Sequence, residues 1–361
     1  MTSVLPIHRQ ARAGARAASA SQLVALAAVT LAVAAVLSLS IGSTGITLSA
    51  LPRVLTATIT GQADAATARE QLVLLDIRLP RLLLGAFVGA ALAVCGAMMQ
   101  GMFRNPLADP GLVGVSSGAA LAAVATIALG NGLAAPWARA FGVYALPFSA
   151  FCGGLAATTL LVAIVGRQGQ LTTSTLLLAG IALGAFSSAL TGLIAFASDD
   201  RELRDLTLWM LGSLSGASLP KVMAVLPFVL SIGLVLPRLI RALNGLLLGE
   251  AEAFHLGIDV EATKRLVIVT TAAGVGAAVA VAGVVGFVGI VVPHLVRLLA
   301  GPDHRVVLPT SALLGGSLVL IGDVVARMAL RPAELPLGVV MALIGAPVFL
   351  HMVVRRGSGG A

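Results

Sequence analysis

Long apolar stretches and short polar stretches alternate along almost the whole chain. Ten of the apolar stretches have the length of a membrane-crossing helix, for which about 20 apolar residues suffice. They cover residues 22–42, 80–102, 112–130, 142–165, 173–197, 221–243, 264–283, 285–300, 306–327 and 335–354, and the eighth is short for a full crossing. Helix-length blocks, rather than alternating strands, predict an all-α polytopic membrane protein with about ten transmembrane helices.

Composition leaves little room for anything outside the membrane. The 361 residues are 58% hydrophobic and 11% charged, whereas soluble domains carry about 25% charged residues. The sequence therefore predicts a single transmembrane domain over 21–356, interrupted by a polar loop at about 244–262. An Ala-, Arg- and Ser-rich tail at 1–20 is expected to be disordered, and residues 357–361 form a short C-terminal tail.

The net charge of +8 is typical of a nucleic-acid-binding protein or of a membrane protein with basic cytoplasmic loops. Ten crossings place both termini on one side of the membrane. With the termini inside, 13 of the 23 Lys and Arg residues but six of the 15 acidic residues face the cytoplasm. This asymmetry predicts cytoplasmic termini and no nucleic-acid partner.

Two segments in oppositely directed crossings resemble each other. GAALAVCG at 89–96 lies in the second apolar stretch, and GAAVAVAG at 276–283 lies in the seventh. The similarity predicts an inverted repeat that relates helices 2–5 to helices 7–10, a common plan among transporters. Its small residues also favour close approach of helix backbones.

Catalytic and metal-binding patterns are missing from the sequence. Neither Lys221 nor Lys264 lies in a phosphate-binding GxxxxGK[ST] loop, and neither HExxH nor CxxC occurs. We therefore expect no catalytic residues, no metal site and no bound cofactor. Asp323 and Arg327 lie four residues apart and can pair on one helix face. Few other charges fall inside the crossings, which disfavours an ion-coupled secondary transporter, the alternative class.

Two polar segments are candidate partner contacts. LGEAEAFHLGIDV at 248–260 is short and helix-prone, and Ala251, Phe254 and Ile258 share one side of that helix. It predicts a helix that either lies on the membrane or docks into a cytoplasmic partner. On the opposite side, Arg78 and Arg81 flank a helix-starting proline, and they either anchor the helix at the interface or bind carboxylates of an external protein.

The chain resembles the permease subunits of type II ABC importers for iron chelates, haem and cobalamin. The resemblance covers about residues 70–354 and rests on seven motifs in the family's order. They are RLPR at 78–81, the run at 89–122 that contains FRNPLADPG, LLAGIALGAFSSAL at 177–190, WMLGSLSGAS at 209–218, the loop at 248–260, GFVGIVVPHLVRLLAGPDHR at 286–305 and PAELPLGVVMALIGAPVFL at 332–350.

The resemblance implies a homodimer in the bacterial inner membrane, with two cytoplasmic ATPase subunits that hold the ATP and a periplasmic substrate-binding protein. Helices at 173–197 and 335–350 would line the pathway. Binding-protein docking would fall to Arg78, Arg81 and Arg327. Coupling to the ATPase would fall to Glu250, Ala251, Glu252, Ala253, Phe254, His255, Leu256 and Gly257.

The segment at 196–209 resembles that of the haem-importing members, which implies haem as the transported substrate. Arg201 and Arg204 would then meet the haem propionates or the binding protein. Ferric siderophores and cobalamin are the alternatives within the family.

Overall fold

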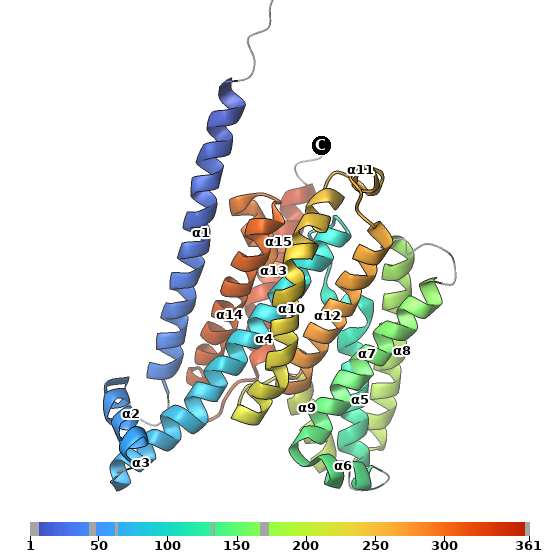
Figure 1. Cartoon of the computed structure of the whole chain (residues 1–361). Coiled ribbons are helices and arrows are strands. Elements are labelled where there is room, and N and C mark those ends of the chain that lie inside the picture. The colour runs from blue at the N-terminus through green and yellow to red at the C-terminus, as the bar shows by residue number, and fades with distance from the viewer. Residues whose placement is uncertain are drawn as a thin grey trace, which may run out of the picture.

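The computed structural model describes residues 7–42, 48–61, 64–130, 132, 134–166 and 173–357. Ten long helices form a bundle over these ranges (Figure 1). They are α1 (Ile7–Ser40), α4 (Leu79–Met102), α5 (Val115–Leu129), α7 (Ala145–Gly166), α8 (Thr173–Ala197), α10 (Leu219–Leu246), α12 (Val260–Ala282), α13 (Val288–Ala300), α14 (His304–Met328) and α15 (Leu337–Gly357). Each coincides with one predicted crossing, so the predicted fold class is confirmed.

Shorter helices connect the long ones at the two ends of the bundle. They are η1 (Leu48–Ala50), α2 (Leu51–Thr60), α3 (Ala65–Gln71), η2 (Leu72–Arg78), η3 (Pro110–Val113), α6 (Ala135–Phe141), η4 (Gly142–Tyr144), α9 (Asp200–Met210) and α11 (Glu250–His255). Figure 1 shows α11 at the end where α1 begins and α15 finishes, and α2, α3, α6 and α9 at the other. We call these the α11 end and the α9 end.

Seven of the described helices are long and apolar enough to cross a membrane, and α5, α13 and α15 supply shorter apolar helices. Two of the short helices, α5 and α13, occupy the third and eighth positions, which an inverted repeat makes equivalent. Each follows a non-helical segment, at 103–109 before η3 and at 283–287 before α13. Shortened helices at matching positions of two halves are a feature of transporter repeats.

The helix contacts follow the symmetry that the repeat predicts. Helix α4 packs on α14 and α13, and its counterpart α12 packs on α7 and α5, which are the equivalents of α14 and α13. The pairs α5·α7 and α13·α14 also match. Both α4 and α12 lie inside the bundle. In their most apolar segments 72% and 78% of the residues are buried, against 17% for α8 and α10.

Two glycines of the repeated motif let α4 contact its neighbours through the backbone. A Cβ atom at Gly89 would collide with the backbone of Gly315 in α14, and one at Gly96 would collide with Gly289 in α13. Side chains at either position would force the helices apart. The expected close approach is therefore present at both glycines of α4.

The N-terminal segment differs from the expectation of a disordered tail at 1–20. Helix α1 begins at Ile7 and continues to Ser40, and residues 1–6 lie outside the described residues. Alanine and arginine are among the best helix formers, so an Ala- and Arg-rich segment extends the apolar helix that follows it. Residues 358–361 of the expected C-terminal tail also lie outside the described residues.

Candidate functional site

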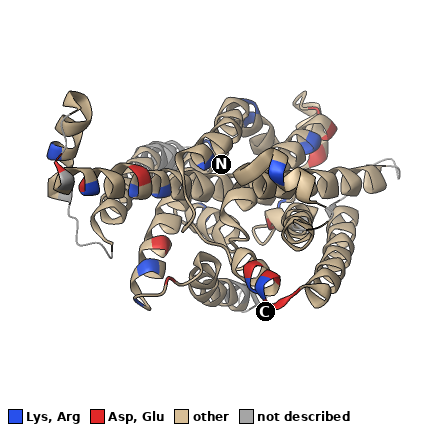
Figure 2. Cartoon of the chain, turned by 90° about the horizontal axis from the view of Figure 1, so that it is seen from below, with Lys and Arg blue, Asp and Glu red and all other residues tan. Residues whose placement is uncertain are grey.

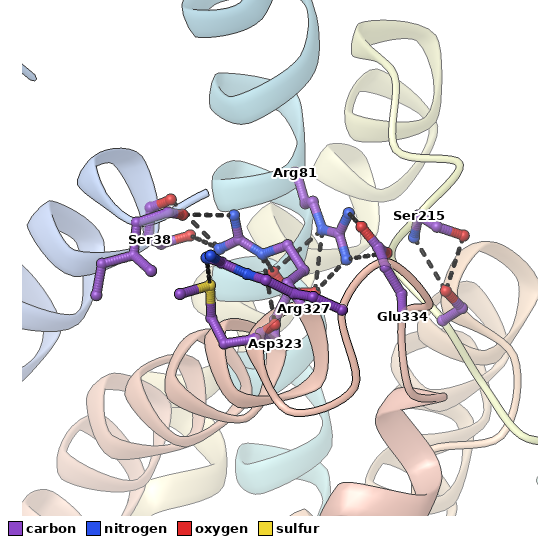
Figure 3. A network of polar contacts seen from close by, with 10 residues as sticks. Ser38, Arg81, Ser215, Asp323, Arg327 and Glu334 are labelled. Carbon is purple, nitrogen blue, oxygen red and sulfur yellow. Dashed lines mark hydrogen bonds and ion pairs between the residues drawn. The ribbon is translucent and has the colours of Figure 1, made fainter. Parts of the chain in front are cut away.

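A buried ion-pair cluster lies at the α9 end of the bundle (Figure 3). Arg81, near the start of α4, is 8% exposed. Its guanidinium lies 2.9 Å from a carboxylate oxygen of Asp323 in α14 and 2.9 Å from Glu334 in the segment before α15. It bonds each carboxylate through two N–H groups. Such paired hydrogen bonds fix the orientation of the guanidinium.

Arg327 joins the same cluster from the last turn of α14. Its Nε lies 3.0 Å from an Asp323 oxygen, so the pairing predicted from the four-residue spacing is confirmed. Its Nη atoms donate to the backbone carbonyls of Ile41 and Ser38 at the end of α1, at 2.9 and 3.3 Å. Arg78 donates to two further carbonyls there, those of Leu39 and Ser40.

The carbonyls at the end of α1 explain where these arginines point. The last turn of a helix leaves carbonyl groups without N–H partners and carries a partial negative charge, so it attracts cations. Arg78 and Arg327 supply those cations from η2 and α14. The hydrogen bonds of Arg78, Arg81 and Arg327 are thus made to acceptors within the protein, and their role in binding-protein docking stays a prediction.

The same three arginines also line an open pocket of about 440 Å3 at the α9 end. Arg331 and Glu334 complete its charged lining. With Asp323 beneath them, four arginines face two carboxylates, and the region keeps an excess of positive charge. Glu334 lies in the PAELP run, but its role was not predictable from the sequence, because no spacing rule connects it to Arg81.

Helix α9 carries the other two candidate arginines. Asp199 accepts a hydrogen bond from the Glu202 N–H, and Glu202 accepts one from the Asp199 N–H, which together form a capping box. Arg201 and Arg204 are exposed on this helix. They lie at the same end of the bundle as the arginine pocket but do not line it. Figure 2, a view from that end, shows the positions of the basic and acidic residues on the helices.

At the opposite end, α11 presents an apolar surface to the outside. Phe254 is 71% exposed and Leu256 is 63% exposed, while Ala253 is fully buried against the bundle. The remaining candidate coupling residues are exposed, namely Glu250, Ala251, Glu252, His255 and Gly257. Gly249 and Gly257 adopt positive φ values of 132° and 79°, which frees the chain to turn sharply on both sides of α11.

One ion pair fixes α11 to the bundle. The Nζ atom of Lys264 in α12 lies 2.9 Å from a Glu250 carboxylate oxygen. An open pocket of about 480 Å3 lies beside α11 between α10 and α12, and Arg238, Arg241 and Asp259 are part of its lining. The α11 end therefore offers an anchored, exposed apolar helix next to a charged hollow.

A polar network behind α11 was not anticipated from the sequence. His304, fully buried at the start of α14, bonds the Asn244 side-chain oxygen through its backbone N–H and ring Nδ1, both at 2.9 Å. Arg297 of α13 lies 3.4 Å from the other ring nitrogen and donates to the Ala97 carbonyl of α4. The network connects four helices at this end. His304 belongs to the GPDHR run, but the sequence could have predicted its bonds to Asn244 only if the packing of α10 against α14 were known.

Asp303 extends this network to the helix terminus. It accepts hydrogen bonds from the Arg305 N–H and the Asn244 amide, at 2.9 and 2.8 Å, and begins α14 as its N-cap. Partial burial alone would raise the pKa of the Asp303 carboxyl, but these hydrogen bonds and the neighbouring charges hold it below its usual range.

A bundle of ten apolar helices with an internal repeat, an exposed apolar helix at one end and an arginine pocket at the other defines a multi-pass membrane transport subunit. A model of the FecCD transport family matches residues 30–355. The chain belongs to this family, and it is a permease subunit of a type II ABC importer. The family resemblance found in the sequence is thereby confirmed.

Three relatives show how far the similarity extends. The chain is 46% identical over 286 residues to the cobalamin import system permease protein of Halobacterium salinarum, covering 79% of this chain and 74% of that protein. It is 44% identical over 282 residues to the hemin transport system permease protein of Yersinia pestis, covering 78% and 83%. A metal-chelate type ABC transporter solved in an inward-facing conformation matches with a TM-score of 0.79 at 32% identity, covering 93% and 99%.

Proposed function

We propose that this permease subunit forms a homodimeric pathway that moves haem from a periplasmic binding protein into the cytoplasm, driven by ATP hydrolysis on two partner subunits. The protein would lie in a bacterial inner membrane with both termini in the cytoplasm. The observation that carries the importer assignment is the contrast between the two ends, an exposed apolar helix at one and an arginine pocket at the other.

The α11 end is suited to receive an ATPase subunit. Phe254 and Leu256 expose apolar surface at this end of the bundle. Large exposed apolar side chains at such a place favour a protein partner. The Lys264–Glu250 pair gives α11 a firm connection to α12, so a push on α11 is transmitted to a central helix.

The α9 end is suited to an acidic partner. Its pocket holds an excess of arginine, and arginine binds carboxylates with two parallel hydrogen bonds. A homodimer would present two such pockets related by a two-fold axis. A binding protein with a carboxylate on each of two lobes would then dock in one orientation, and charge complementarity would speed the encounter.

Haem is the proposed cargo because Arg201 and Arg204 stand exposed on α9 near the same end, three residues apart on one helix face. Two arginines at that spacing match two propionates beside an apolar ring. Cobalamin is the second candidate, favoured by the 46% identity to a cobalamin permease, and a ferric siderophore is the third. Loss of haem transport in an Arg201→Gln, Arg204→Gln double variant would support haem.

The deciding experiment reconstitutes the permease in liposomes with its ATPase and binding protein. ATP hydrolysis and uptake are measured with haem, cobalamin or a ferric siderophore. Stimulation by haem alone supports the proposal. Stimulation by cobalamin or by the siderophore alone keeps the importer and overturns the cargo.

The ion-coupled alternative requires a carboxylate that gains and loses a proton inside the membrane. Asp323 is 1% exposed and lies 2.9 and 3.0 Å from two guanidinium groups, so its charge is compensated in place. This arrangement favours a structural carboxylate over a proton carrier. Uptake that collapses with a protonophore at constant ATP would overturn the ATP-driven assignment.

A further inference from the structure

A groove runs along the bundle surface between α7, α10 and α12. Two adjoining cavities form it, one of about 280 Å3 near the α9 end and one of about 190 Å3 farther along the helices. They are continuous, because Pro147, Ala280 and Val281 line both. None of the lining residues belongs to the arginine pocket or to the pocket beside α11. The groove is therefore distinct from those two pockets.

The mouth of the groove is polar and carries one positive charge. Lys221, in the first turn of α10, lines it together with Ser213 and Ser215. The Lys221 ammonium folds over the loop before α10, where a Cβ on Gly216 would lie 3.0 Å from it. Among the residues that the structure describes, no carboxylate lies within 4.0 Å of Lys221.

The two serines add a hydrogen-bond donor beside that charge. The Ser215 N–H donates to the Ser213 hydroxyl at 3.0 Å, and the Ser213 hydroxyl donates to that of Ser215 at 2.9 Å (Figure 3). The Ser215 hydroxyl acts as acceptor in this pair, so its own proton points elsewhere. An ammonium and a hydroxyl donor together match the oxygens of a phosphate group.

The deeper cavity is a slot with apolar walls. Its lining includes Phe148 and Phe151 from α7 and Phe228 from α10, with Ala224 between Phe228 and the mouth. Phe228 lies seven residues beyond Lys221 on α10, a rise of about 10 Å along the helix. The groove thus begins at a charged, hydrogen-bonding mouth and continues toward the middle of the bundle as an apolar slot.

The surroundings of the groove indicate a surface within the lipid. Leu219 and Met223 on α10 are 56% and 58% exposed, and Phe148 on the opposite wall is 45% exposed. α10 is also long and apolar enough to cross the membrane. Large apolar side chains exposed along a membrane-crossing helix contact acyl chains, so the occupant of the groove comes from the bilayer.

We propose that this groove binds an anionic phospholipid, with the phosphate at Lys221 and Ser215 and one acyl chain in the slot that ends at Phe228. Charge selects the lipid class, since an unpaired ammonium beside a hydroxyl donor favours a headgroup with net negative charge over a zwitterionic one. The polarity of the groove sets the orientation, since only an amphiphile fits a charged mouth and an apolar floor.

The test uses the purified full-length permease after delipidation in a non-ionic detergent. Binding of dioleoyl phosphatidylglycerol, dioleoyl phosphatidylcholine or inorganic phosphate is followed by native mass spectrometry. Lys221→Gln removes the charge, and Ala224→Phe fills the slot without changing the charge. Arg139→Gln is the matched control, because Arg139 is exposed at the same end and does not line the groove.

We expect phosphatidylglycerol to bind more tightly than phosphatidylcholine. Lys221→Gln should lower the affinity for phosphatidylglycerol about fivefold, which corresponds to about 1 kcal/mol for one basic side chain. Ala224→Phe should lower the affinity for both lipids, and Arg139→Gln should change neither affinity. Equal binding of the two lipids, or an unchanged affinity in Lys221→Gln, would overturn the proposal. If inorganic phosphate bound to the wild type without displacing lipid, the mouth would be an anion site, and the lipid proposal would be overturned.

Discussion

Arg81 and Asp323 lie 242 positions apart in the sequence, yet the Arg81 guanidinium and the Asp323 carboxylate meet at 2.9 Å inside the protein. The contact joins α4 to α14, the helix pair whose repeat equivalent is α12 with α7. Arg327 approaches the same carboxylate from the other side at 3.0 Å. One buried carboxylate thus compensates two arginines at the place where the two halves of the repeat meet.

Replacing Asp323 with Asn should therefore destabilise the fold strongly. The substitution keeps the size of the side chain but leaves the Arg81 and Arg327 guanidinium groups without their shared counter-ion. Breaking a buried pair from one side costs about 3–5 kcal/mol. Thermal unfolding of the purified permease in detergent measures the loss. Asp205→Asn, on the exposed surface of α9, is the control and should leave the melting temperature unchanged.

The backbone contact between α4 and α13 leads to a second prediction. Gly96→Ala should lower stability by about 1–3 kcal/mol, the usual cost of overpacking a core, because the new Cβ meets the Gly289 backbone and that backbone has little freedom to move aside. Gly233→Ala, in the middle of α10, meets nothing within 4 Å. It should be neutral or slightly stabilising, because Ala favours helix over Gly. Equal melting temperatures for the two variants would contradict the close backbone contact between α4 and α13 at Gly96.

Much of the fold could be predicted from the sequence, because length and hydropathy determine which segments cross a membrane. The ten apolar stretches correspond to ten helices, and the GAALAVCG echo predicts the related partners of α4 and α12. The helical start of α1 at Ile7 was missed, since an Ala- and Arg-rich composition suits both a solvated tail and a helix. The short helices α2, α3 and α6 were missed because they are too brief to produce a periodic pattern.

The polar sites were less predictable, because their contacts depend on which helices pack together. The Asp323–Arg327 pair follows from spacing within one helix and could be predicted. The Arg81–Glu334 pair and the Asn244–His304 bonds join distant segments, so no local pattern indicates them. The arginines near the end of α1 illustrate the difference. Their positive charge was visible in the sequence, but the carbonyls that attract Arg78 and Arg327 were not.

The exposed ring on α11 gives a prediction about ATPase assembly. Phe254→Ala should weaken association of the ATPase subunit by about 2 kcal/mol or more, the loss typical of a central aromatic contact. The fold should persist, because the Phe254 side chain is 71% exposed. Co-purification from detergent and basal ATP hydrolysis of the complex are the measurements. Phe196→Ala, an equally large change at a 90% exposed phenylalanine of α8, should leave association intact.

The arginine pocket allows a sharper test of docking than removal of Arg81 or Arg327, whose loss would also break the buried cluster. Arg331 and Glu334 are exposed neighbours that line the same pocket and carry opposite charges. Arg331→Glu should slow association of an acidic binding protein by about tenfold at low salt, as expected when an electrostatically steered encounter loses its attraction.

Glu334→Gln should have the opposite effect. It removes the negative charge at one edge of the Arg81 guanidinium, so it raises the positive charge of the pocket and leaves one of the two Arg81 donors there without its carboxylate acceptor. Surface plasmon resonance with the immobilised permease measures both rates, and melting temperatures confirm that both variants fold. Salt should reduce the difference between the variants, because it screens exposed charges. Changes of the same sign in the two variants would show that the pocket does not receive an acidic partner.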